Sequence, residues 1–174
     1  MFKSPEFIKR IEGEDNTMLQ QLSLLQAINA KGLLTTNSQA GRLTKGKSLA
    51  DGKRYEISER AYIDGFMLEE QAEDFIKNIS LNTDKVAVFV PSCTGDMYLP
   101  SKLDVPLTIS KDEGKATIET HTSLAIPKEV WEFYRKSLKI NKSEKVVYIF
   151  CWDPQWNRLA SGKKGLFTEV LKNL

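Results

Sequence analysis

The stretch Gly32-Leu33-Leu34-Thr35-Thr36-Asn37-Ser38-Gln39 begins as an apolar strand and continues into five consecutive hydroxyl and amide side chains. Folding alone does not require so many adjacent hydrogen-bonding groups at the end of a strand. Small polar ligands are commonly held by a few polar groups on a rigid element. Residues 35–39 therefore form either a ligand site or a set of side chains that cap a neighbouring turn or helix.

Hydrophobic spacing predicts a helix before this stretch and a strand after it. Four apolar residues recur at steps of three and four positions: Met18, Leu22, Leu25 and Ile28. They predict an amphipathic helix that is capped by Asn16 or Thr17 and ends at Gly32. Residues 40–54, with three glycines and five basic side chains, predict a mobile surface loop. The alternation from Tyr55 to Met67 predicts a strand with both faces in use.

The second half of the chain continues this mixture. Buried or alternating strands are predicted at Lys85–Val90, Ile118–Leu124 and Val146–Trp152, and a weaker strand around Leu107–Ile109. Helices are predicted by three sets of apolar residues: Ala72, Phe75, Ile76 and Ile79; Val130, Trp131, Tyr134 and Leu138, after Pro127 in the first turn; and Leu166, Phe167, Val170, Leu171 and Leu174.

The order α, β, β, α, β, β, β, α, β, α predicts a mixed α/β (α+β) fold in which amphipathic helices flank a mixed sheet. Residues 1–15 are polar and charged and predict a flexible N-terminal lead-in. The domain is therefore expected over residues 16–174, and a chain of 174 residues is long enough to bury one core.

Charge and hydropathy exclude several classes of partner. The formal net charge of +2, from 25 basic and 23 acidic residues, gives no electrostatic reason to expect nucleic acid or an acidic membrane. No apolar stretch approaches the roughly 20 residues needed to cross a bilayer. The N-terminus also lacks a signal-peptide pattern. We expect a cytoplasmic protein whose basic segment 42–54 is solvated, with contact to an anion or nucleic acid as the alternative.

Few residues are suited to catalysis. His121 is the only histidine, which excludes paired-histidine catalysis and a histidine-rich zinc site. Cys93 and Cys151 are far apart in sequence and are expected to be reduced thiols, with one disulfide as the alternative. A Cys–His pair with either cysteine stays open, although Cys151 lies in an apolar run and is expected to be packed and inert. No phosphate-binding glycine loop is present.

Two sequence runs together resemble a known family. Gly32 to Gln39 and the run Ala61 to Phe66, followed by a helix from Glu69, are similar to the C-terminal regulatory domain of eukaryotic methylenetetrahydrofolate reductase. Looser similarity continues through Thr117-Ile118-Glu119 and Val146–Asp153, so that the resemblance covers roughly residues 16–174. The flavin-binding catalytic barrel of that family has no counterpart in the chain.

The resemblance implies a stand-alone, non-catalytic module that binds S-adenosylmethionine or S-adenosylhomocysteine and holds no prosthetic group. By motif position, Thr35 and Ser38 correspond to ligand-contacting residues, and Thr117 and Thr108 to a third and a fourth. Hydroxyl groups suit this task because they hydrogen-bond the ribose and the amino-acid carboxylate of such a ligand.

Three functions are compatible with these observations. The first is a sensor domain for an adenosyl ligand, and the second is a protein-interaction domain that kept the fold and lost the ligand. The third is a small enzyme that acts on an adenosyl ligand. The expected partners are accordingly a small adenosyl ligand, and a protein partner or a second copy of the chain.

Overall fold

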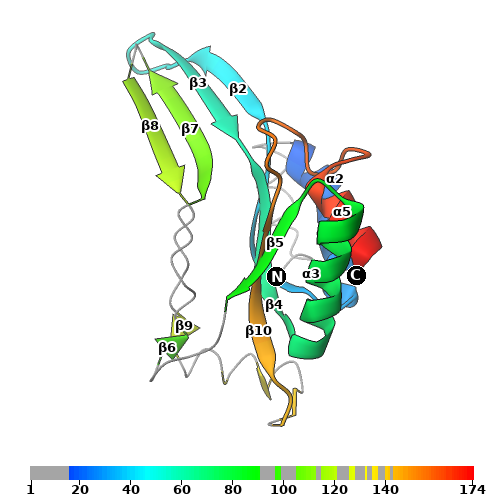
Figure 1. Ribbon diagram of the computed structural model, residues 1–174. Coiled ribbons are helices and arrows are strands. Elements are labelled where there is room, and N and C mark those ends of the chain that lie inside the picture. The colour runs from blue at the N-terminus through cyan, green and yellow to red at the C-terminus, as the bar shows by residue number, and fades with distance from the viewer. Residues whose placement is uncertain are drawn as a thin grey trace.

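The computed structural model describes residues 16–90, 97–98, 105–112, 115–120, 126–127, 132, 135–136, 140–141 and 143–174. These residues form three helices, two antiparallel four-stranded sheets and a two-stranded ribbon, which confirms the mixed α+β fold. Figure 1 shows the helices gathered on one side of the first sheet, while the second sheet projects away from them. No helix among the described residues is both long and apolar enough to span a membrane.

The first sheet contains the strands with the strongest apolar patterns. Its order is β1 (Leu34–Ala40), β4 (Ala61–Leu68), β10 (Val146–Trp152) and β5 (Val86–Val90), and all neighbouring strands are antiparallel. The predictions for β5 and β10 are confirmed, and β10 lies inside the sheet as its continuous apolar run suggested. The five polar residues 35–39 lie within β1 instead of after a strand end.

All three predicted helices that fall on described residues are present: α2 (Asn16–Ala30), α3 (Glu69–Asn82) and α5 (Leu166–Asn173). Their apolar residues and one face of the first sheet share a single buried cluster, which includes Ile28, Ile63, Phe75, Ile149 and Phe167. The chain after α2 turns at Gly32, whose φ of 111° favours glycine.

Strand β4 has both faces buried, as its alternation predicted. Ala61, Ile63 and Met67 face the helices. On the other side, Tyr62 packs with Phe150 of β10 and with Leu107. Every residue from Ala61 to Met67 is buried, so β4 contributes to two cores at once.

Two predictions are wrong in the region of the second sheet. Residues 40–54 contain a strand instead of only a loop, and residues 55–67 form parts of two strands instead of one. The order of the second sheet is β2 (Leu43–Lys47), β3 (Arg54–Glu59), β7 (Pro106–Asp112) and β8 (Lys115–Thr120). Lysines and a glycine make β2 resemble a loop in composition, but alternate positions of this exposed edge strand face solvent. β3 ends at Glu59, and only Arg60 separates it from β4 in the other sheet.

The prediction of a helix that begins at Pro127 is wrong at its start. Pro127 belongs to β9 (Ile126–Pro127), which pairs with β6 (Met97–Tyr98). Glu132, Arg135 and Lys136 are helical, whereas Val130, Trp131, Tyr134 and Leu138 lie outside the described residues. β7 and β8 confirm strands around residues 107–109 and 118–120, and residues 121–124 of the predicted strand also lie outside the described part.

Gly65 in β4 gives a test of the contact between β1 and β4. A Cβ at this position would lie 2.1 Å from the Leu34 carbonyl oxygen. We expect Gly65→Ala to lower the free energy of unfolding by about 1–3 kcal/mol in urea denaturation, because the backbone of β1 must move. Gly162→Ala, whose Cβ would lie 3.3 Å from the Leu159 carbonyl oxygen, is the control and should change stability by less than about 1 kcal/mol. Equal effects of the two substitutions would contradict this account.

Candidate functional site

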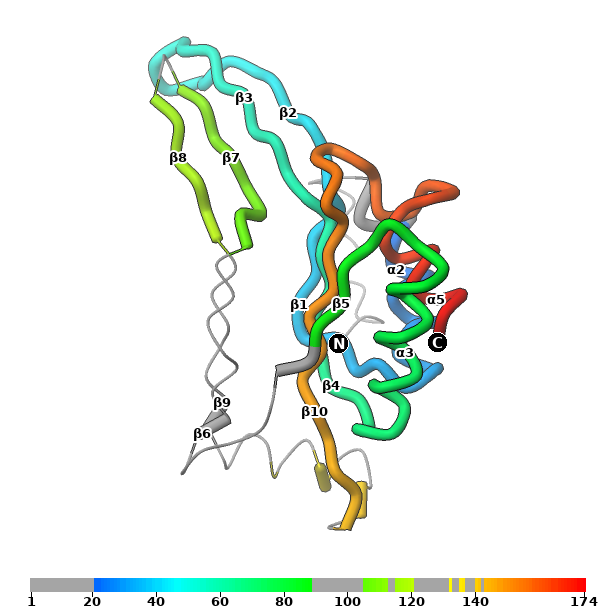
Figure 2. Tube along the Cα trace, in the orientation of Figure 1, coloured from blue at the N-terminus to red at the C-terminus, as the bar shows by residue number. Residues whose placement is uncertain are grey.

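The two runs that carry the family resemblance meet at one cavity. β1 and β4 are neighbours in the first sheet (Figure 2). Leu34 lies opposite Phe66, and Thr35 lies opposite Gly65. Where β1 begins and β4 ends, a cavity of about 340 Å³ opens towards the start of α3. Its lining residues come from four segments of the chain: Asn29, Gly32 and Leu34; Phe66, Met67, Leu68 and Gln71; Ile140; and Glu144 and Val146.

The lining is mainly apolar, with three polar side chains. Pockets for small ligands are typically about 300–1,000 Å³ and combine apolar walls with a few fixed polar groups. Asn29 is held by its own bonds, since its Nδ2 donates to the Leu25 carbonyl and to Thr35 Oγ1, both at 2.7 Å. The Glu144 carboxylate accepts a hydrogen bond of 2.6 Å from the Asn141 amide. The cavity thus has an apolar wall and one carboxylate among its lining residues.

Thr35 lies next to this cavity but does not line it. Its hydroxyl oxygen accepts the hydrogen bond from Asn29, and its backbone N–H donates to Asn29 Oδ1 at 3.0 Å. Two bonds between one threonine and one asparagine fix the end of α2 against β1. Thr35 therefore orients a lining residue.

The other three residues implied by the resemblance lie elsewhere. Ser38 is opposite Ile63, whose side chain belongs to the helix-side core, so Ser38 shares that side of the first sheet. Thr108 and Thr117 lie on adjacent strands of the second sheet and share one face, because Thr117 pairs with Ser110 and Thr108 with Glu119. The structure thus brings Thr35 together with Ser38 on β1, and Thr108 together with Thr117, but the two pairs lie on different sheets.

A buried carboxylate that the sequence did not single out lies beside the cavity. Asp64 is only 2% exposed, and the Thr36 hydroxyl donates to its Oδ1 at 2.6 Å. The Tyr148 hydroxyl lies 3.3 Å from the same threonine oxygen, and burial, followed by the Asp64 charge, raises the Tyr148 pKa. The Tyr148 ring meets the ring of the lining residue Phe66 edge to face at 5.1 Å. A polar residue in the alternating run 61–67 was the only signal in the sequence.

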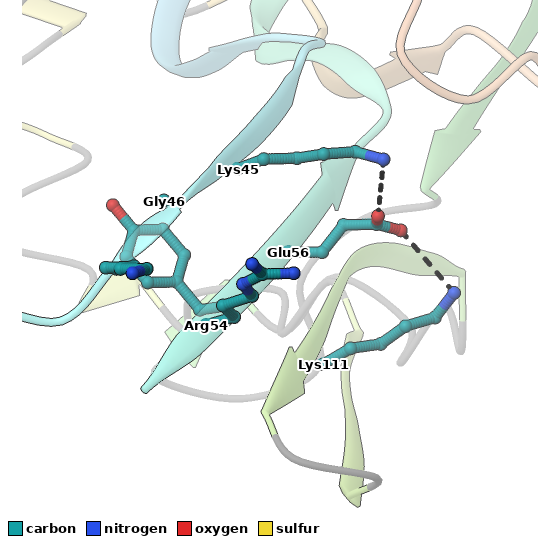
Figure 3. Close-up of a pocket in the computed structure, with 7 residues that line it drawn as sticks. Lys45, Gly46, Arg54, Glu56 and Lys111 are labelled. Atoms are coloured by element: carbon teal, nitrogen blue, oxygen red, sulfur yellow. Dashed lines mark ion pairs between the residues drawn. The ribbon is translucent and has the colours of Figure 1, made fainter. Parts of the chain in front are cut away.

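A basic cleft on the second sheet is a separate feature. It measures about 590 Å³ and is lined by Lys45, Gly46, Lys47, Arg54, Tyr55, Glu56 and Lys111. Figure 3 shows the Glu56 carboxylate between Lys45 and Lys111. Its Oε2 lies 2.8 Å from Lys45 Nζ, and its Oε1 lies 3.5 Å from Lys111 Nζ. The hydrogen bond from Lys45 is the main cause of a lowered Glu56 pKa. Part of the positive charge is thus neutralised within the cleft.

Another charged cluster holds the last loop in place. Lys85 is buried and lies 3.1 Å from the carboxylate of Asp153, which is also fully buried. Asp84 pairs with Lys85 and with Arg158, and the hydrogen bond from Lys85 is the main cause that lowers the Asp84 pKa to about 2. Arg158 also lies 3.5 Å from Asp153. Two carboxylates and two cations balance one another, so we assign this cluster a structural role.

Two kinds of reactive site can be checked among the described residues, a metal centre and a reactive thiol. No group of three or more metal-ligating side chains occurs among them. Cys151 is a free, fully buried thiol whose pKa is raised by burial, which confirms that it is packed in the core. Cys93 and His121 lie outside the described residues.

Substitution of Thr36 tests how far Asp64 depends on its hydroxyl partner. Thr36→Val removes the donor and leaves a buried carboxylate oxygen with one hydrogen bond fewer. We expect the free energy of unfolding to fall by about 1–3 kcal/mol in urea denaturation at pH 7. Thr120→Val, at an exposed position of β8, should change it by less than about 0.5 kcal/mol. A Thr36→Val variant as stable as the wild type would show that Asp64 does not need this bond.

Alkylation tests the inertness of Cys151. In a Cys93→Ser variant, iodoacetamide should modify Cys151 only as fast as the whole protein unfolds, because the thiol is buried and its pKa is raised. Mass spectrometry with and without urea measures this rate. Rapid labelling of the native protein would instead make Cys151 a reactive thiol.

No curated protein matches the chain. A family described as Domain of unknown function (DUF6919) matches residues 4–174, nearly the full length. The chain belongs to this DUF6919 family.

Proposed function

We propose that this chain is a non-catalytic ligand-binding domain whose cavity between β1, β4 and α3 takes S-adenosylmethionine or S-adenosylhomocysteine. One observation carries the proposal: the two runs that resemble the regulatory domain of methylenetetrahydrofolate reductase lie on paired strands and contribute to one cavity. The resemblance supplies the class of ligand, and the cavity supplies a place of suitable size.

The chemistry of the lining fits such a ligand. Leu34 and Phe66 offer an apolar wall to an adenine ring or to the thioether carbons. The Glu144 carboxylate would pair with the ammonium group, and with the sulfonium of S-adenosylmethionine. The Gln71 amide can both donate and accept hydrogen bonds. A ligand that leaves these polar groups unpaired would bind more weakly, which gives the cavity selectivity.

A second candidate function is a protein-interaction domain, and the second sheet favours it. β8 is exposed along its whole length, and Leu43 and Ile118 are 46% and 58% exposed. A protein-interaction domain needs no small ligand. A screen with adenosyl compounds therefore distinguishes the two functions, because only the ligand-binding domain should respond.

Thermal shift and calorimetry test the ligand. We expect S-adenosylmethionine or S-adenosylhomocysteine at about 100 times its Kd to stabilise the protein by about 2.7 kcal/mol. For a domain of this size the melting temperature should rise by roughly 5–10 °C. Gln71→Leu and Glu144→Gln should each weaken binding about tenfold or more, because each removes a polar contact. Glu70→Gln, at an exposed position of α3 that is not in the lining, is the charge-matched control and should bind like the wild type.

Two variants of β1 locate the ligand more closely. Thr35→Val should weaken binding through Asn29, whereas Ser38→Ala should leave it within about twofold if the ligand occupies the cavity. A larger effect of Ser38→Ala than of Gln71→Leu would place the ligand at the residues that the resemblance implies. No response to either adenosyl compound would refute the proposal and leave the interaction domain.

A further inference from the structure

The second sheet has two edge strands with opposite chemical character. β2 and β8 end the order β2-β3-β7-β8, and within the described part of the chain each pairs on one side only. An edge strand presents unpaired backbone N–H and C=O groups, and proteins normally protect such edges with lysines, prolines or bulges. The two edge strands, β2 and β8, differ in how they are protected against pairing with another strand.

β2 is protected by its charges. Lys45 and Lys47 alternate along it, and Arg54 lies opposite Lys47 on the next strand. If two copies of β2 met antiparallel about Gly46, Lys45 of each would face Lys47 of the other. If they met about Lys45, the two Lys45 side chains would face each other. Like charges directly opposite each other destabilise a strand pair, so both of these registers are unfavourable for a second copy of β2.

β8 carries a single lysine, Lys115, at its start, and so lacks the alternating lysines that protect β2. Its sequence, Lys115-Ala116-Thr117-Ile118-Glu119-Thr120, contains neither proline nor glycine, and all six residues are exposed. In Figure 1 it is the outermost strand of the sheet that projects from the domain. No ion pair joins Lys115 or Glu119 to another residue among those described. Both charges are therefore available to a partner.

The sequence of β8 is complementary to itself in one antiparallel register. Centred on Thr117, a two-fold axis perpendicular to the sheet places Lys115 opposite Glu119 of the second copy, twice by symmetry. Ala116 then faces Ile118 of the second copy, and the two Thr117 side chains face each other. Opposite charges, a pair of threonines and an apolar pair are the cross-strand combinations that stabilise antiparallel sheets.

We infer that β8 is a self-association edge, which pairs with β8 of a second copy to form one continuous eight-stranded sheet. The interface is isologous, because the same strand serves both copies, and it closes at two copies. Ile118, 58% exposed in the single chain, gains an apolar neighbour. The inference does not depend on the adenosyl ligand, since none of these residues lines the cavity between β1 and β4.

Charge exchange tests this pairing in the full-length protein. Sedimentation equilibrium of the wild type at increasing concentration should show a monomer–dimer equilibrium. Lys115→Glu places two carboxylates opposite each other, and Glu119→Lys places two ammonium groups opposite each other, in each case twice. Each variant alone should weaken dimerisation at least about tenfold at low salt and less at high salt. An equimolar mixture of the two variants should restore the dimer, since every opposed pair again has opposite charges.

Two controls and three contradicting outcomes complete the test. Lys47→Glu on β2 and Glu70→Lys on α3 make the same charge changes away from β8 and should leave the dimer unchanged. Circular dichroism and thermal melts should show all variants folded, because every substituted side chain is exposed. A wild type that stays monomeric at the highest soluble concentration would overturn the inference. So would a dimer that neither variant weakens, or a mixture of variants that does not restore it.

Discussion

The close approach of β1 to β4 is the constraint on which the remaining structure depends. β4 lies between β1 and β10, and every residue from Ala61 to Met67 is buried. Gly65 leaves room for the Leu34 carbonyl, which a side chain at that position would displace. The helices on one side and the aromatic residues on the other side pack against the strand that this contact places.

A bulge in β1 supplies a hydrogen-bond donor to the Asp64 carboxylate, which is buried in β4. Asp64 is buried, and a buried carboxylate is costly without hydrogen-bond donors. The register of β1 shifts between Thr35 and Asn37, so Thr36 is the extra residue of the strand and its hydroxyl reaches Asp64. Its neighbour Thr35 bonds to Asn29. The polar residues that first suggested a ligand site thus have structural partners as well.

Several of the elements that the sequence predicted correctly have regular apolar periods, although β8 is exposed along its whole length. β10, β5, α3 and α5 bury side chains at regular steps, and that burial determines their structure. β2 could not be recognised, because Lys45 pairs with Glu56 of β3, and such a cross-strand partner cannot be read from the local sequence. Pro127 suits both the first turn of a helix and a short strand, and its pairing with Met97 decides between them.

The site could be predicted only in part. Leu34 and Phe66 came from the two recognised runs, but Asn29, Gln71 and Glu144 belong to segments that meet through tertiary contacts alone. Thr108 and Thr117 were assigned from a motif, and a motif does not determine which sheet a strand joins. Local patterns therefore located the strands that frame the cavity, while its polar lining required the fold.

The single residue between the two sheets has a mechanical consequence. Arg60 connects β3 to β4 without a loop, and its N–H bonds to the Leu107 carbonyl of β7 at 2.8 Å. The Gln39 side chain of β1 donates to the carbonyls of Arg60 and Leu107, at 3.0 Å and 3.3 Å. Because the junction is one residue long and carries three hydrogen bonds, it restricts rotation of the second sheet relative to the first. The projecting sheet is accordingly held rigidly to the rest of the domain. A force on its far end would be transmitted to Ala61, where β4 begins.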